Sequence, residues 1–400
     1  MEYSTLAPWQ EISETGVMYD LGSLYDHFRQ IKDPRKAHGK RYSLVTLLVV
    51  IFLAKLSNQE TPVAIADWAR NHAVKLAELL QLKRTWMPHH NTIRRVFQTI
   101  LSVAEFERLV RDYHQQQPGG GTQWAIDGKT LRGTRIPDAA PAQHILSVYD
   151  VQTQRVVAQA VVETKENEIV AAPQALQQVC VKGKIITGDA MHAQRAISAD
   201  LVAQGGDYLW VVKENQERLY QDIERLFAPD TPLPGCGQLA TDFQHAETVN
   251  GGHGRIEKRS IQTSALLNRY VDWPGCGQVY RLERTLTWMR RGKAVKTSHE
   301  IEYGITSLTR EKAPAQRVLQ VRRQHWFVET GLHYRRDVTF HEDATRMTKG
   351  TAGCILAMVH NLVLGLIKRA GYHNAAQGRR YFEGHMDQAF ALLLAGAPRS

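Results

Sequence analysis

The sequence predicts a mixed α/β protein: a sheet domain that follows an all-helical N-terminal domain and carries a β-rich insertion. Residues 20–115 contain apolar and amphipathic runs with the period of helices. Residues 123–227 begin with hairpin-linked strands and then alternate strands with helices, which is typical of a mixed sheet. Residues 228–306 are rich in proline, glycine and period-two alternation, which indicates β structure. The predicted domains are 1–115, 123–227, 228–306 and 307–400, with 116–122 as a linker.

The composition of the 400-residue chain is that of a globular protein with room for more than one domain. Its hydrophobic content of 43% and charged content of 22% are ordinary. The net charge of +10 favours a polyanionic partner, with nucleic acid first and an anionic membrane second. The most apolar run, Leu44–Leu56, is shorter than the ~20 residues that a bilayer span needs, so no membrane partner is expected. Four cysteines without a C-x-x-C pair indicate a reducing cytoplasm.

The N-terminal domain is expected to consist of helices separated by short breaks. These helices are predicted at Leu21–Ile31, 43–56, Pro62–Leu82 and Thr92–Leu101. Asn91 can cap the last of them, which displays Arg94 and Arg95 side by side. Helices joined by a turn, with arginines exposed on the second, resemble DNA-binding helical modules. A helical packing or dimerisation domain is the alternative. Gln115–Thr122, with its Pro-Gly-Gly-Gly run, is the clearest linker.

Two aspartates in the sheet domain each follow an apolar strand. Asp127 ends the predicted strand Gln123–Asp127, and Asp189 ends the predicted strand Lys184–Asp189. Further strands are expected at His144–Tyr149, Arg155–Val162 and Tyr208–Val212. Because side chains at the carboxyl edge of a sheet project into a crevice, Asp127 and Asp189 are expected to lie there together.

A charged segment late in the chain, Val321–Asp337, is predicted to form one helix. Helical spacing puts six of its side chains on one stripe: Arg322, His325, Trp326, Glu329, His333 and Arg336. Phe327, Val328 and Leu332 turn the other way. A carboxylate framed by basic and imidazole groups can bind a cation while its neighbours bind phosphate. A solvated charged helix face is the alternative.

Asp127, Asp189 and Glu329 together suit divalent-metal chemistry on a phosphodiester. Three converging carboxylates repel unless they share cations, and Mg²⁺ prefers oxygen ligands. Two Mg²⁺ ions can clamp the attacking and leaving oxygens, and Mn²⁺ can substitute. Arg322, His325 and Arg336 are expected to neutralise the phosphates around the scissile bond, with orientation of Glu329 as the alternative role of His325. Lys129 and Arg132 are expected to contact DNA or phosphate, with a solvated loop as the alternative. His192 is expected to be a bystander or a DNA contact, because Mg²⁺ disfavours nitrogen.

These residues resemble the triad of bacterial insertion-sequence DDE transposases, and of the ISAs-type group with its H-repeat-associated proteins in particular. Asp127 stands in Ala-Ile-Asp-Gly-Lys, Asp189 in Thr-Gly-Asp-Ala-Met-His-Ala-Gln, and Glu329 in Arg-x-His-Trp-x-Val-Glu. Further stretches are similar to recurrent stretches of the group: Phe28–Arg35, Pro88–Arg95, Gly252–Glu257, Tyr303–Ser307 and Asp337–Asp343. The resemblance covers almost the whole chain, and it is the combined pattern that is specific.

The resemblance implies a ribonuclease H-like core, two divalent metal ions, and cleavage and rejoining of double-stranded DNA at transposon ends. The implied partners are terminal inverted repeats and target DNA, with a homodimer in the synaptic complex and a nucleoid-associated location. One departure concerns the flanks of Glu329. Many relatives carry Tyr-x-x-Arg-x-x-x-Glu followed by a lysine seven residues on, where this chain has Arg322, His325 and Arg336. Two alternatives stay open: a metal nuclease without strand transfer, and a non-catalytic DNA-binding remnant.

Overall fold

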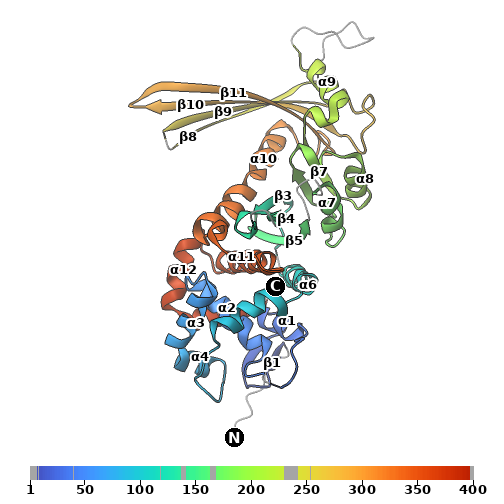
Figure 1. The fold of residues 1–400 in the computed structure, drawn as a ribbon. Coiled ribbons are helices and arrows are strands. Elements are labelled where there is room, and N and C mark those ends of the chain that lie inside the picture. The colour runs from blue at the N-terminus through green and yellow to red at the C-terminus, as the bar shows by residue number, and fades with distance from the viewer. Residues whose placement is uncertain are drawn as a thin grey trace. The chain divides into compact units, whose positions relative to one another are not determined.

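A computed structural model describes residues 7–396 of the chain, except residues 8, 39, 118, 137–140, 163–167, 229–241 and 253. The chain divides into two compact units (Figure 1). Unit 1 comprises residues 1–120, 128–167 and 329–400, and unit 2 comprises residues 121–127 and 168–328. The chain therefore passes between the units at Asp127–Gly128 and at Val328–Glu329, two of the places where the sequence predicts an active-site acid.

Helices make up most of the first 115 residues, which belong to unit 1. They are α1 (Leu24–Gln30), α2 (Leu44–Leu56), α3 (Pro62–Asn71), α4 (Ala73–Leu79), α5 (His90–Arg95), the π-helical turn η1 (Val96–Ile100) and α6 (Val103–Gln115). A two-stranded antiparallel sheet of β1 (Gln10–Ile12) and β2 (Met18–Asp20) precedes them, so the prediction of an all-helical domain is not confirmed. The N-cap of α5 is His89, whose Nδ1 accepts from the Asn91 amide, and not Asn91 itself.

The core of unit 1 is built around two apolar helices, α2 and α11 (Ala352–Arg369). Helix α2 begins at an N-cap, Ser43, and buries all but one of its 13 residues. Helix α11 packs on α2, on α6 and on the hairpin of β4 (Gln143–Asp150) and β5 (Arg155–Val162). It is the described helix whose length and composition would suit a membrane span, and 89% of that stretch is buried within the structure. Helices α12 (Ala375–Gly384) and α13 (Met386–Leu394) complete the unit.

The sheet of unit 2 is mixed, which confirms the predicted mixed α/β class. Its strands are β3 (Gln123–Leu131), β6 (Ile185–Gly188), β7 (Asp207–Val212), β8 (Gln244–Gly252), β9 (Arg255–Ser264), β10 (Gln278–Arg290) and β11 (Lys293–Thr306). Their order is β3-β6-β7-β11-β10-β9-β8, with β3, β6 and β7 parallel and the rest antiparallel. Strand β3 is shared between the units, because its residues from Gly128 onward belong to unit 1. Helices α7 (Glu168–Leu176), α8 (Arg195–Ala203), α9 (Glu217–Leu226) and α10 (Ala315–His325) belong to unit 2.

The β-rich segment predicted at 228–306 extends this sheet. Residues Tyr303–Thr306 of β11 pair with Leu209–Val212 of β7, so the four long strands continue the parallel strands without a break (Figure 1). Helix α10 packs on β6, β8 and β9. Its Leu319 shares one hydrophobic core with Ile261 of β9 and Leu282 of β10. The sequence contains Pro-Gly-Cys-Gly-Gln twice, at 234–238 and 274–278, and the first copy lies outside the described residues.

Gly304→Ala is expected to destabilise the chain, because a Cβ at Gly304 would overlap the ring of Tyr280. Tyr280 is fully buried and its hydroxyl donates to the Trp210 carbonyl oxygen, so the ring has no room to withdraw. Overpacking of this kind costs about 1–3 kcal/mol. The measurement is the free energy of unfolding by urea. Gly251→Ala in β8 is the control, since a Cβ there meets no atom within 4 Å. Equal free energies for the two variants would contradict the prediction.

The predicted single helix over 321–337 is wrong. Helix α10 ends at His325, Trp326 forms a turn, and two π-helical turns follow, η6 (Glu329–His333) and η7 (Arg335–Thr339). Wider π turns change the angle between successive side chains. The predicted stripe is therefore divided: Trp326 is 49% exposed, whereas Arg336 is fully buried.

Candidate active site

Asp127 and Asp189 occupy equivalent positions on neighbouring parallel strands of unit 2. Ala125 of β3 pairs with Thr187 of β6, and each aspartate lies two residues further along its own strand direction. Side chains two residues apart point to the same face of a sheet, and neighbouring strands lie about 4.8 Å apart. Continued two residues past the Ala125–Thr187 pair, this register predicts that both carboxylates face the same side of the sheet. The prediction that Asp189 follows the end of its strand is confirmed. The same prediction for Asp127 is wrong, because β3 continues to Leu131.

His325 holds the carboxylate of Asp189. Its Nε2 lies 3.5 Å from Asp189 Oδ1, and its Nδ1 lies 3.0 Å from the hydroxyl of Thr187. The hydrogen bond from His325 is the main reason that the pKa of Asp189 is lowered to about 2. Burial lowers the pKa of His325 itself, so the imidazole is neutral at pH 7. With the proton on Nε2, the ring donates to Asp189 and accepts from Thr187. Asp189 is thus a fixed, ionised carboxylate with its side chain 60% exposed.

Arg322 is buried at the end of α10, where it binds Glu302 of β11. Two parallel hydrogen bonds join them, Nε to Oε1 at 2.6 Å and Nη2 to Oε2 at 2.7 Å. Its guanidinium also lies 5.3 Å from the centre of the Trp326 ring. Only 3% of Arg322 is exposed. The predicted contact between Arg322 and DNA phosphate is therefore not favoured, because its charge is already matched within unit 2.

A cleft of about 720 Å³ opens beside Asp189 within unit 2. Among its lining residues are Asp189, Tyr220, Glu300, Glu302, Arg322 and Trp326. The prediction from sequence missed Tyr220, Glu300 and Glu302. The two glutamates stand two residues apart in a stretch of period-two alternation, so the sequence indicates that they share one face of a strand. Because they are far from Asp189 in the sequence, no local pattern indicates that they line the same cleft. The cleft thus sets a half-exposed indole beside an ionised carboxylate.

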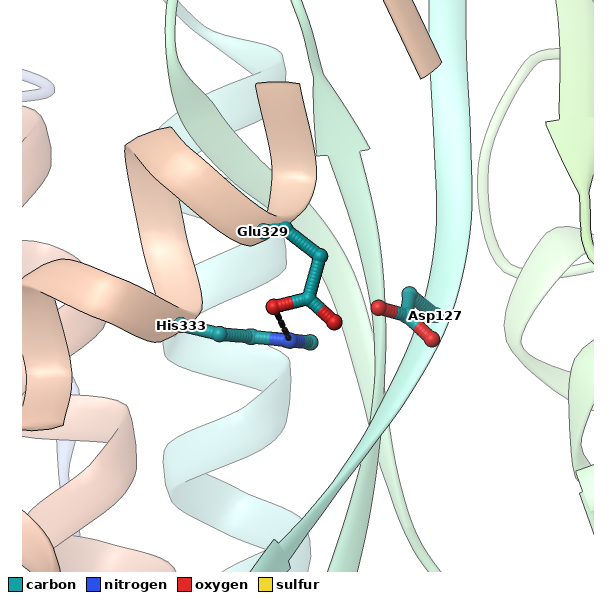
Figure 2. A group of neighbouring side chains, drawn as sticks. All are labelled: Asp127, Glu329 and His333. Carbon is teal, nitrogen blue, oxygen red and sulfur yellow. Dashed lines mark ion pairs between the residues drawn. The ribbon is translucent and has the colours of Figure 1, made fainter. Parts of the chain in front are cut away.

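Glu329 begins the π-helical turn η6 in unit 1. The Nδ1 atom of His333 lies 3.8 Å from Glu329 Oε2 (Figure 2, which also draws Asp127 on β3). The Glu329 side chain is 53% exposed, whereas that of His333 is 6% exposed. Burial lowers the pKa of His333, against the effect of Glu329. His333 is therefore a neutral ring close to an accessible carboxylate, a pairing that the sequence suggested only as a shared helix stripe.

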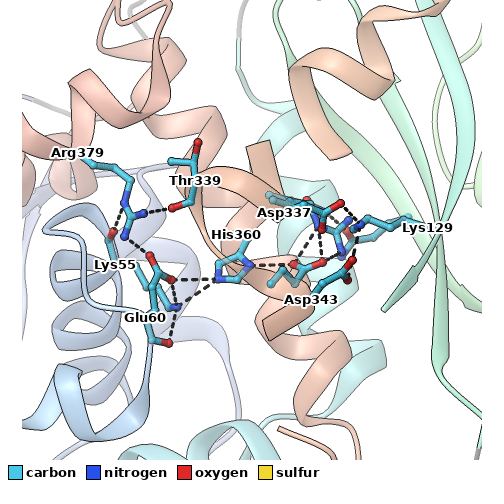
Figure 3. A network of polar contacts seen from close by, with 12 residues as sticks. Lys55, Glu60, Lys129, Asp337, Thr339, Asp343, His360 and Arg379 are labelled. Atoms are coloured by element: carbon cyan, nitrogen blue, oxygen red, sulfur yellow. Dashed lines mark hydrogen bonds and ion pairs between the residues drawn. The ribbon is translucent and has the colours of Figure 1, made fainter. Parts of the chain in front are cut away.

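Two further cations that the sequence analysis assigned to DNA are used inside unit 1. Lys129 Nζ lies 2.7 Å from Asp337 Oδ2 and 3.9 Å from Asp343 Oδ1 (Figure 3). Arg336 is fully buried, and its Nε and Nη2 donate to Glu342 at 2.7–3.0 Å. Both charges are neutralised by carboxylates, which argues against their direct contact with DNA. Three of the seven predicted DNA contacts are exposed: Arg94, Arg95 and Arg132.

His192, which follows Asp189 by three residues, is a buried residue of unit 2. Its Nε2 lies 3.6 Å from Glu168 Oε2, and only 1% of it is exposed. Its burial favours the bystander role of the two considered.

Comparison with known proteins places the chain in a family. Residues 118–363 match the family model described as "Transposase DDE domain", and residues 25–114 match the one described as "DDE_Tnp_1-associated". The first match covers more than half of the chain. The chain therefore belongs to a bacterial DDE transposase family, the class of protein that the predicted triad indicated.

Individual relatives agree with this assignment. The chain is 28% identical over 388 residues to "H repeat-associated putative transposase YhhI" of Escherichia coli, covering 94% of this chain and 99% of that one. It is 29% identical over 388 residues to "Putative protein YbfL" of the same organism, with the same coverage. A third E. coli protein, "H repeat-associated putative transposase YbfD", is 32% identical over 244 residues, which are 60% of this chain and 93% of that one.

Proposed function

We propose that the chain cleaves double-stranded DNA at the ends of an insertion sequence and joins the freed 3′-hydroxyl to target DNA. In this proposal Asp127, Asp189 and Glu329 are the catalytic carboxylates of a ribonuclease H-like core. The observation that carries the proposal is the register of β3 and β6, which aligns Asp127 with Asp189. Glu329 follows by four residues in the sequence the histidine that binds Asp189.

The donor set fits Mg²⁺. Three carboxylates offer hard oxygen ligands, which Mg²⁺ and Mn²⁺ accept, and two such ions when bound stabilise the attacking and leaving oxygens of a phosphodiester. His333 offers nitrogen, which Mg²⁺ disfavours, so its proposed role is to orient Glu329. Imidazoles that position a ligating carboxylate are common around metal sites.

The chain's own groups keep the Asp189 carboxylate charged and in place. His325 keeps Asp189 ionised well below neutral pH. The Arg322–Glu302 pair anchors the end of α10, so His325 is presented from a fixed backbone. Trp326, half exposed in the cleft beside Asp189, offers an apolar face to a sugar or base that flanks the scissile phosphate. In this proposal Trp326 orients the DNA strand, His325 and Arg322 hold the protein side of the site, and no covalent enzyme intermediate is needed.

The proposed partners are terminal inverted repeats and target DNA, bound by a cytoplasmic, nucleoid-associated protein. The net charge of +10 favours such a polyanion. Arg94, Arg95 and Arg132 are exposed cations available to the backbone. Holding two ends together requires at least two copies, so a homodimer is proposed for the synaptic complex.

The test is cleavage and joining by Asp189→Asn. The isosteric amide keeps the size of the side chain but loses its charge. Because metal stabilisation is worth several kcal/mol, the cleavage rate is expected to fall by a factor on the order of 10³, with DNA binding retained. Asp200→Asn, on the exposed surface of α8 in unit 2, is the matched control.

The readouts are nicking of labelled element ends in Mg²⁺ and joining of a pre-cut end to a target plasmid. Equal cutting by wild type and Asp189→Asn would refute the proposed site. Cutting without joining would support a nuclease, and binding without cutting by wild type would support a DNA-binding remnant.

A further inference from the structure

A basic pocket of about 530 Å³ lies in unit 1 between helix α5 and the segment 345–351. Arg94 and Arg95 line it from α5, and Arg346 and Lys349 line it from the segment. The two sides are some 250 residues apart in sequence, and they correspond to the two separate family matches. The two arginines of α5 were predicted DNA contacts, whereas Arg346 and Lys349 were not among the predicted site residues.

The segment 345–351 is held at both ends. Before it, Glu342 is bound by the buried Arg336, and Asp343 lies near Lys129 (Figure 3). At its end, Gln143 Nε2 donates to the Gly350 carbonyl oxygen at 2.8 Å. Gly350 has a φ of +58°, and a Cβ there would lie 3.1 Å from the Gln98 carbonyl oxygen, so glycine permits the close approach to the turn that follows α5. Between these ends the Met347 side chain is buried.

The cations of this pocket are available to a ligand. Arg95, Arg346 and Lys349 are exposed and have no ion pair or hydrogen bond from their side chains within the described part of the chain. Arg94 donates to the neutral amide of Asn91 at 3.1 Å. No carboxylate is found among the described lining residues. Lys129 and Arg336, in contrast, are matched by acids. Four positive charges around one pocket repel one another, and a bound anion offsets that repulsion.

We propose that this pocket binds the phosphate backbone of duplex DNA, with Arg346 and Lys349 as direct phosphate contacts. The proposal rests on the proposed transposase function and adds a positioning site to it. Arginine and lysine with nearby amide and hydroxyl groups (Asn91 and Thr348) are the donors that hold phosphates. No aromatic ring is among the described lining residues, so the pocket offers backbone contacts without base stacking.

The test is the salt dependence of DNA binding by the full chain. Each phosphate contact contributes about 0.9 to the slope of log K against log salt concentration. Arg346→Ala/Lys349→Ala is expected to lower the slope by about 1.8. Between 50 and 200 mM salt, the factor by which affinity decreases is then about twelve times smaller for this variant than for wild type. Lys83→Ala/Arg84→Ala, which removes two exposed cations outside the pocket, is the control and is expected to keep the wild-type slope.

Fluorescence anisotropy with a labelled DNA duplex gives the slopes, and thermal unfolding checks that the variants fold. An unchanged slope for Arg346→Ala/Lys349→Ala, or a change seen with duplex RNA only, would overturn the proposal. Measuring DNA cleavage alongside the slope separates the failure of the pocket proposal from the failure of the proposed function. A lowered slope together with an inactive wild type would refute only catalysis, whereas an unchanged slope with active wild type would refute only the pocket.

Discussion

Glu329→Cys is expected to lose DNA cleavage in Mg²⁺ and to recover part of it in Mn²⁺. Mg²⁺ binds oxygen and accepts sulfur poorly, whereas Mn²⁺ tolerates a thiolate better. Loss of one carboxylate ligand should lower the rate in Mg²⁺ by a factor on the order of 10³. The ratio of the rates in Mn²⁺ and Mg²⁺ should then rise at least about ten-fold over that of wild type. Initial rates of nicking at equal metal concentration give this ratio.

Two variants delimit the role of Glu329. Glu329→Ala offers no ligand and is expected to be inactive with both ions. Glu311→Cys places a thiol on an exposed position of unit 2 and should keep the wild-type ratio. If Glu329→Cys and Glu329→Ala respond alike to Mn²⁺, Glu329 does not bind the metal. A readout independent of activity is the affinity for Mn²⁺ measured by electron paramagnetic resonance, which should fall for Glu329→Ala.

The elements predicted best are those whose turn, cap and hydrophobic pattern all lie within a short stretch of sequence. The predicted strand Arg155–Val162 is reproduced without shift as β5. The turn before it is set locally, since Asp150 Oδ1 accepts from the amides of Gln152 and Thr153 and Gln154 takes a φ of +56°. Helix α2 likewise matches the expected apolar run, with Ser43 as its cap. Short-range sequence determines such elements almost completely.

The elements predicted poorly depend on contacts that are remote in sequence. Strand β3 was expected to stop before Gly128, yet it continues to Leu131. The helix expected at 321–337 gives way to π turns, and a Cβ at Gly331 would lie 2.4 Å or so from the Tyr149 hydroxyl, a close approach that no local pattern reveals. The domain boundaries stay a prediction. Periodicity locates elements, but tertiary partners decide where they end.

In the candidate site, too, the features set by local sequence were predicted and those set by remote contacts were not. The three acids were chosen from their own motifs, and the register of β3 and β6, paired as far as Ala125 and Thr187, supports the association of Asp127 with Asp189. The basic residues around them were assigned to DNA because helical spacing shows cations but not their partners. Glu302, which binds Arg322, lies 20 residues upstream, and Glu342, which binds Arg336, lies beyond the π turns. A buried cation and a DNA-binding cation look alike in sequence, and only the position of the nearest carboxylate separates them.

Arg336→Met is expected to be the most destabilising of the substitutions considered. Burial alone would raise the pKa of Glu342, but Arg336 and His360 lower it well below its usual range. Methionine leaves Glu342 buried with His360 as its remaining partner, at 2.8 Å. Removing one member of a buried ion pair costs about 3–5 kcal/mol. The effect should spread, because His360 also contacts Lys55, which pairs with Glu60 (Figure 3). The measurement is the free energy of unfolding by urea at pH 7.

The pH dependence of this loss identifies its cause. In wild type the depressed pKa of Glu342 gives stability that is present above the unfolded value of about 4.3 and is lost as the pH falls further. In Arg336→Met burial raises that pKa, so protonation of Glu342 favours the folded state. The deficit should therefore shrink between pH 7 and pH 4.5. Arg70→Met, which breaks an exposed pair with Asp67, should change little. A deficit that stays constant over this range would assign the loss to packing of the arginine stem, and not to an uncompensated carboxylate.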